Sequence, residues 1–134
     1  MSYEEKLECF KVIFEKHHQE RQKRLYPELL PDVVRTETGY KFDKVFVIQG
    51  ADNPSGRYMV ENRTGKIYGI KSWTQVNKRR QYGTLETVDQ FDWSEFYARP
   101  LPGTDAEREH VERETAIKST QKKRGRKSNA SKLA

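Results

Sequence analysis

The stretch that decides the fold is RYMVENRTGKIYGIK, residues 57–71. It contains two short runs with good strand formers, Tyr58, Met59 and Val60 in the first and Ile67, Tyr68 and Ile70 in the second. Between them lies Asn62-Arg63-Thr64-Gly65, in which the glycine can take the positive φ that a bulged hairpin loop requires. The stretch therefore predicts a β-hairpin at the centre of the chain.

The N-terminal residues 2–25 predict an amphipathic helix. Ser2 can cap its first turn, and apolar side chains recur at steps of three and four residues, at Leu7, Phe10, Ile13, Phe14 and then His17. Pro27 and Pro31 end the helix, because proline disfavours helical backbone at the residue before it. The apolar stripe is expected to pack on the sheet, and a dimer or partner interface is the alternative.

One long strand is predicted before the hairpin, over residues 40–49, and Val33 and Val34 can begin a shorter one. Within 40–49 the alternation places Tyr40, Phe42, Phe46 and Ile48 on one face and Val45 and Val47 on the other. The turn-rich residues 50–56 then connect this strand to the hairpin. Three consecutive antiparallel strands predict a small meander against the helix.

After the hairpin, the prediction is a helical turn or loop over 72–77 and a basic loop at Lys78-Arg79-Arg80. A short extended piece follows at 85–88, and aromatic residues between 91 and 97 are expected to close the core, with Ser94 capping a brief helix. Thr104-Asp105-Ala106-Glu107 fits a capping box and predicts a helix from 105 to about 119.

These elements predict an α+β fold in four parts. The N-terminal helix spans 1–25, a small core with three or four antiparallel strands spans 26–101, a solvent-facing helix spans 102–119, and a disordered basic tail spans 120–134. The chain has 134 residues and carries a net charge of +6. No window is apolar enough to span a membrane and no secretory signal is visible, which predicts a cytoplasmic protein, or a nuclear one in a nucleated host.

No pattern of residues indicates an enzyme, a cofactor or a metal site. The three histidines have no metal-ligand spacing, and no HExxH, GxSxG, Walker or GxGxxG motif is present. The single cysteine, Cys9, cannot form an internal disulfide or a CxxC site. Four carboxylates at Glu86, Asp89, Asp92 and Glu95 are interleaved with apolar residues, which is typical of a solvated acidic face.

The basic tail is the first candidate for function. Its cations are Lys122, Lys123, Arg124, Arg126 and Lys127. Such a segment neutralises phosphates and binds nucleic acid with strong salt dependence. The Arg-Gly-Arg within it resembles the centre of the AT-hook, a minor-groove DNA-binding motif, although Lys127 stands where that motif has proline. A nuclear localisation signal and a solvated tail that aids solubility are the alternatives.

Residues 63–80 are the second candidate, because they hold six bases and no acid. The candidate phosphate-binding residues are Lys71, Lys78, Arg79 and Arg80, and Tyr68 and Trp73 are candidates for stacking on bases. Stacking requires these rings to be exposed. The alternative places both rings in the core, which leaves only the basic loop for phosphate contact.

Three runs of residues resemble small uncharacterised proteins of tailed bacteriophages. They are Gly56-Arg-Tyr-Met-Val-Glu, Gly65-Lys-Ile-Tyr-Gly-Ile-Lys and Gln81-Tyr-Gly-Thr-Leu, and the resemblance covers about residues 40–98. It implies a phage setting and a compact core, and it implies no reaction.

The sequence as a whole predicts a non-enzymatic nucleic-acid-binding accessory protein that acts through the tail and the basic loop. The alternative is a protein–protein interaction module, an assembly component or an inhibitor of a host protein, that uses the N-terminal helix or the aromatic surface near Trp93.

Overall fold

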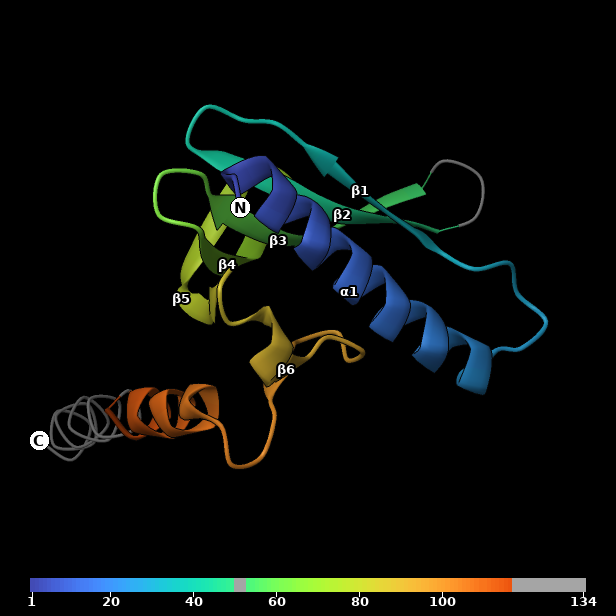
Figure 1. Cartoon of the computed structure of the whole chain (residues 1–134). Helices are drawn as coiled ribbons and strands as arrows, with labels where there is room; N and C mark the ends of the chain where they lie inside the picture. Colours follow the sequence, from blue (N-terminus) through green and yellow to red (C-terminus); the bar gives the residue numbers. More distant parts are fainter. Residues whose placement is uncertain (50–52, 117–134) are drawn as a thin grey trace, which may run out of the picture.

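The computed structural model describes residues 1–49 and 53–116, and it shows an α+β arrangement (Figure 1). The elements are α1 (Tyr3–Leu25), β1 (Val33–Glu37), β2 (Phe42–Gln49), β3 (Asn53–Glu61), β4 (Lys66–Ser72), β5 (Gln75–Thr84), a 3-10 turn (Val88–Gln90), β6 (Phe91–Asp92), β7 (Arg99–Pro100) and a helix over 105–116. Strands β1 to β5 form one antiparallel sheet in chain order, and β6 pairs with β7. No described helix is long and apolar enough to cross a membrane.

The central hairpin is confirmed as β3 and β4. Met59 lies opposite Tyr68 and Val60 opposite Ile67 in their register. Gly65 ends the connecting turn with a φ of 76°, and its amide donates to the carbonyl of Glu61 at 2.7 Å. The carbonyl of Gly65 in turn accepts from the Leu85 amide, which ties the turn to the end of β5. The hairpin therefore organises the strands on both sides of it.

Helix α1 lies over one face of the sheet, which we call the covered face and define by Val45, Val47, Tyr58, Val60 and Ile67 (Figure 1). Ser2 caps the helix by accepting from the Glu5 amide at 3.2 Å. Phe10 and Phe14 are the buried residues of α1 and pack against Tyr58, with ring centroids 5.9 and 5.3 Å from it. The predicted stripe therefore forms the core, as aromatic side chains that bury large areas do.

Trp93 completes this core from the segment after β5. It is fully buried, and its ring centroid lies 4.6 Å from that of Phe10. Its indole donates to the Val88 carbonyl at 2.9 Å, and its amide donates to Nδ1 of His17 at 3.1 Å. Its backbone and its side chain are thus both tied to neighbouring elements. The prediction that the aromatic cluster closes the core is confirmed for Phe91 and Trp93, whereas Phe96 and Tyr97 are exposed.

The sequence predictions were wrong at several strand boundaries. The sheet has five strands, because residues 75–84 form β5 where a helical turn and loops were expected. Residues 85–87 form a turn, and no helix follows Ser94. Strand β3 begins at Asn53, so Pro54, Ser55 and Gly56 belong to it. Proline is tolerated there because β4 pairs only with Tyr58–Val60 of β3 and leaves its first half at an edge.

The helix over 105–116 begins as the capping motif predicts, with one difference. The Thr104 hydroxyl accepts from the Glu107 amide, but the Glu107 carboxylate accepts from the amide of Gly103 instead of Thr104. Ala106 is buried, and the Arg113 guanidinium donates to the Gln81 carbonyl at 2.8 Å. The helix therefore docks on β5. The predicted disordered tail and the end of this helix lie outside the described residues.

Candidate nucleic-acid interface

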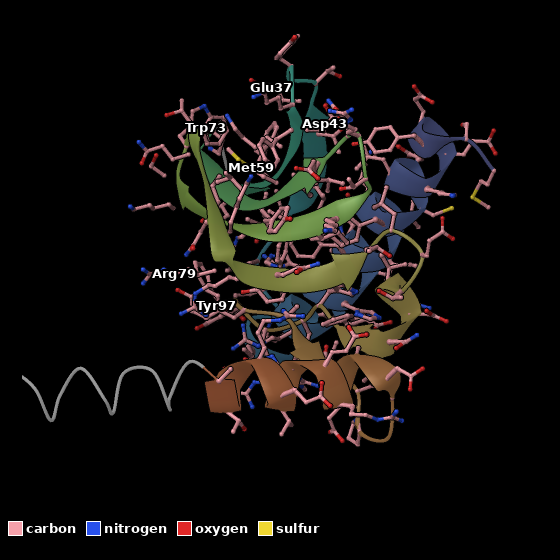
Figure 2. The ribbon with its side chains drawn as sticks, turned by 90° about the vertical axis from the view of Figure 1, so that its left-hand side faces the viewer. Glu37, Asp43, Met59, Trp73, Arg79 and Tyr97 are labelled. Atoms are coloured by element: carbon pink, nitrogen blue, oxygen red, sulfur yellow. The ribbon has the colours of Figure 1, made fainter. Side chains whose placement is uncertain are left out.

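The second face of the sheet points away from α1, and no described helix lies over it (Figure 2). We call it the open face and define it by Phe42, Lys44, Phe46, Met59, Tyr68 and Trp73. Lys44, Met59 and Tyr68 lie opposite one another on β2, β3 and β4, and residues opposite each other in an antiparallel sheet share a face. Trp73 belongs to the same face because its ring packs against that of Phe46, with the two ring centroids 5.4 Å apart.

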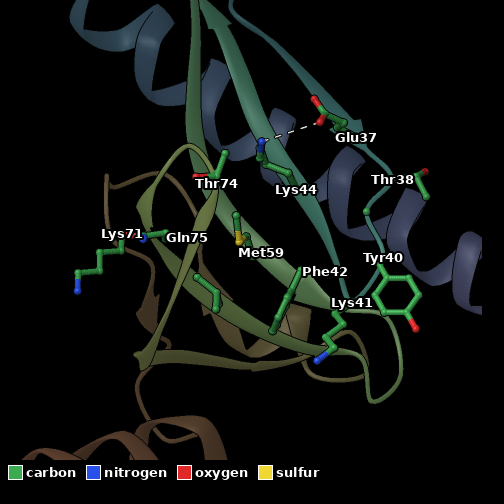
Figure 3. A pocket seen from close by; sticks show the side chains of 12 residues that line it. Glu37, Thr38, Tyr40, Lys41, Phe42, Lys44, Met59, Lys71, Thr74 and Gln75 are labelled. Carbon is green, nitrogen blue, oxygen red and sulfur yellow. Dashed lines mark ion pairs between the residues drawn. The ribbon is translucent and has the colours of Figure 1, made fainter.

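The hairpin of β4 and β5 curls over this face. Trp73 and Thr74 form its tip, and Trp73 contacts residues of β2 although β3 lies between β2 and β4 in the sheet. The curl leaves a hollow of about 640 Å³ between the tip and the β1–β2 turn (Figure 3). Phe42, Met59 and Val76 supply apolar walls, and Tyr40, Lys41 and Lys71 stand on the rim. The hollow is open to solvent and combines apolar surface with cations.

Lys44 is a lysine held inside this hollow. Its side chain is mostly buried, and its ammonium lies 3.9 Å from Glu37 and 3.8 Å from the centroid of the Trp73 ring. Both contacts compensate for the loss of water around the charge. Lys44 therefore presents its charge to the exposed tryptophan instead of to bulk solvent.

Lys78, Arg79 and Arg80 occupy a bulge in β5. Gly69 of β4 pairs with Asn77 and Tyr68 pairs with Gln81, so one step along β4 corresponds to four along β5. The three basic residues are therefore extruded from the ladder, and all three are exposed. The Lys78 ammonium lies 5.7 Å from the centroid of the Phe42 ring, which places it beside the open face. The Arg80 guanidinium lies 4.1 Å from the ring of Tyr97.

The two predicted stacking residues differ in exposure. Tyr68 is only 9% exposed and packs its ring against Phe42, with the centroids 6.2 Å apart, whereas Trp73 is 40% exposed. Part of the Trp73 ring is thus accessible to solvent, whereas the Tyr68 ring is buried against Phe42. Lys71 is exposed on the rim. The candidate tail residues Lys122, Lys123, Arg124, Arg126 and Lys127 lie outside the described residues.

The two surfaces that the sequence suggested for protein binding were the apolar stripe of α1 and the aromatic surface near Trp93. The stripe of α1 is occupied by the sheet, since Phe10 and Phe14 are buried, and Trp93 is fully buried as well. Exposed apolar side chains in or near these elements include Val12, Leu25, Tyr26, Phe96 and Tyr97. No group of three or more potential metal ligands occurs within residues 1–49 and 53–116.

Sequence reasoning missed six residues that lie on this face or around its hollow: Tyr40, Lys41, Phe42, Lys44, Phe46 and Met59. The strand alternation that set Phe42 and Phe46 opposite Val45 and Val47 already indicated a second apolar face. The sequence did not predict β5. Without β5 there is no β4–β5 hairpin, and so its tip could not be expected to fold back over that face. The burial of Lys44 depends on Trp73, which is distant in sequence.

Comparison with known proteins adds no relative: no family model, no curated protein and no solved structure matches this chain. The resemblance to phage proteins stays a prediction.

Proposed function

We propose that the protein binds single-stranded nucleic acid on its open face as a non-enzymatic accessory protein of the cell interior. The observation that carries the proposal is the contact between the 40% exposed Trp73 ring and the Lys44 ammonium, beside a hollow that Lys44 lines and whose rim carries Lys41 and Lys71. Bases stack on aromatic faces while basic side chains follow the phosphates, and this combination is the physical basis of sequence-tolerant binding to single strands.

A single strand fits this site better than a duplex. Phe42 lines the concave hollow and the exposed Trp73 ring lies beside it, so an unstacked base can enter where a base-paired one cannot. In this proposal Lys41 and Lys71 on the rim and Lys78 and Arg79 on the bulge contact the phosphates on either side of such a base. In this proposal the basic tail adds sequence-independent affinity. A phage setting, implied by the resemblance, is part of the proposal.

The test is a salt titration of binding, measured by fluorescence anisotropy with labelled oligothymidine, oligouridine and a DNA duplex. The full chain is expected to bind the single strands more tightly than the duplex, and its affinity should fall with salt. The double variant Lys78→Gln/Arg79→Gln should lower the slope of log K against log salt by about 1.4, because each single-strand phosphate that a cation neutralises contributes about 0.7.

Two further variants make this test specific. Lys16→Gln/Lys23→Gln removes the same charge from positions on α1, away from the open face, and should leave the slope nearly unchanged. Replacing the five basic tail residues by glutamine separates the tail from the sheet. If only the tail variant changes binding, the open face is not the interface. If the full chain binds no nucleic acid even at low salt, the proposal fails and the protein–protein module becomes the better hypothesis.

A further inference from the structure

A second site lies around Arg57 of β3. The register between β2 and β3 slips between Val45 and Phe46, and Arg57 is the residue left unpaired. The ring of Phe96 lies 4.5 Å from the centre of its guanidinium. The Nε atom of Arg57 is buried and has no hydrogen-bond partner among the described residues. The bulge thus leaves Nε of Arg57 buried without a hydrogen-bond acceptor among the described residues.

Two tyrosine hydroxyls share this condition. The hydroxyls of Tyr58 and Tyr82 are buried and unpartnered within the described part of the chain, and together with Nε of Arg57 they are the only such side-chain atoms there. The two residues are 1% and 7% exposed, and their rings are 5.3 Å apart. Tyr58 approaches the Ala98 backbone and Tyr82 approaches Arg80, but neither approach meets hydrogen-bond geometry.

The nearby carboxylate does not neutralise Arg57. Asp32 is already engaged, because its carboxylate is 2.8 Å from Nε2 of His18 and accepts from the Gln22 amide at 3.1 Å. No ion pair joins Arg57 to any described acid. Desolvation accordingly lowers the pKa of Arg57. A partly buried cation and two buried hydroxyls that lack partners are each unfavourable, and a ligand with acceptor oxygens would satisfy the groups that it reaches.

The space beside Arg57 indicates the class of that ligand. A pocket of about 420 Å³ is lined by Arg57 and Tyr82, by Lys71, and by the rings of Trp73, Phe96 and Tyr97. Several donors and more than one cation exceed what a single carboxylate can satisfy, whereas a phosphate monoester offers three acceptor oxygens and close to two negative charges. The aromatic walls suit a flat ring attached to the phosphate.

We propose that the Arg57 pocket binds a nucleoside monophosphate group, either as a free nucleotide or as the phosphorylated end of a strand. Arg57 holds the phosphate through its guanidinium, and the Tyr82 hydroxyl, the one of the two that lines the pocket, donates to one of its oxygens. The aromatic walls hold the base. The pocket shares Trp73 and Lys71 with the open face and its hollow, but Arg57 and Tyr82, which hold the phosphate, belong to neither.

The test uses the full chain at low salt, with adenosine monophosphate as the probe and calorimetry as the readout. Adenosine monophosphate should bind, adenosine should bind at least about tenfold more weakly because it lacks the charged acceptor, and inorganic phosphate should compete. Arg57→Met should abolish binding, whereas the matched control Arg63→Met, in the exposed β3–β4 turn, should retain it. Tyr82→Phe removes one oxygen only and should weaken binding several-fold, which keeps the test decisive if Arg57→Met fails to fold.

Two oligonucleotides identify the source of the phosphate. If a 5′-phosphorylated oligothymidine binds more tightly than its 5′-hydroxyl form, and Arg57→Met removes that advantage, the ligand is a strand end; binding of the free nucleotide alone indicates a metabolite. The inference is overturned if neither adenosine monophosphate nor inorganic phosphate binds, if acetate binds in their place, or if Arg57→Met and Tyr82→Phe leave binding unchanged. Lys78→Gln/Arg79→Gln should not alter nucleotide binding, so failure of this site and failure of the open face are distinguishable.

Discussion

The two faces of the same sheet carry similar aromatic content and differ in what lies over them. On the covered face, Phe10 and Trp93 pack on Tyr58, and no more than 1% of any of these three residues is exposed to solvent. On the open face, Phe46 and Trp73 pack on each other under a hairpin tip and remain partly exposed, with Lys44 among them. Full burial maximises stability, whereas partial burial beside a cation keeps ring surface available for a ligand.

The largest expected effect compares one phenylalanine from each face. Phe10→Ala should lower the free energy of unfolding by about 3–5 kcal/mol, because it removes a fully buried ring and leaves a cavity. Phe46→Ala should lower it by about 1 kcal/mol, because only part of its ring is removed from water. Urea unfolding of both variants measures the difference. Equal losses would mean that the open face is as much a part of the core as the covered face.

The second prediction concerns binding, for which a residue of the open face should matter more than one of the covered face. Trp73→Ala should weaken binding to oligothymidine by about ten- to a hundredfold, since stacking of one base contributes about 1–3 kcal/mol. Its free energy of unfolding should change by less than that of Phe10→Ala, and Trp73→Phe should retain much of the affinity. Trp93 is buried, so any fluorescence quenching by the strand should disappear in Trp73→Phe. Unchanged quenching in that variant would contradict the assignment of the stacking ring.

The sequence was sufficient for the covered face and insufficient for the open one. The helical period of α1, the cap at Ser2 and the hairpin at Gly65 are local signals, and each was confirmed. Strand β5 was missed because its bulge at Lys78–Arg80 interrupts the alternation that marks a strand. The hollow follows from the curl of the β4–β5 hairpin, and the Arg57 pocket follows from a register slip, and both depend on pairing between strands that no local pattern encodes.

The third prediction concerns the end of α1 that lies over the covered face. The Tyr3 hydroxyl donates to the Asp43 carboxylate at 2.6 Å, and Asp43 is buried. Tyr3→Phe should therefore lower the free energy of unfolding by about 2 kcal/mol, the scale of a hydrogen bond to a charged group. Phe46→Ala serves as the comparison on the open face. A loss near zero would show that Asp43 is satisfied by the Gly39 amide alone.

The same hydrogen bond gives a pH dependence of known sign. Burial and then Asp43 raise the pKa of Tyr3 above its ordinary value of 10.0, so the folded state favours the protonated phenol. Its contribution to stability is complete below pH 10 and declines as the pH rises further, because only the unfolded chain then releases the proton. The difference in stability between wild type and Tyr3→Phe should therefore shrink above pH 10. Burial also raises the pKa of Tyr58 and Tyr82, so wild-type stability falls in the same range.

The smallest expected effect lies at Gly65, in the turn that both faces share. A Cβ at this position would meet nothing nearer than Leu85 at 3.9 Å, so its cost is conformational and not steric. Gly65→Ala should lower the free energy of unfolding by about 1 kcal/mol because of the left-handed φ, and Gly65→Asn by less, since asparagine tolerates that region. Neither variant should change the affinity for oligothymidine under conditions where the chain is folded. A selective loss of binding in Gly65→Ala would show that the turn sets the geometry of the open face, and that the two faces are not as separable as their packing indicates.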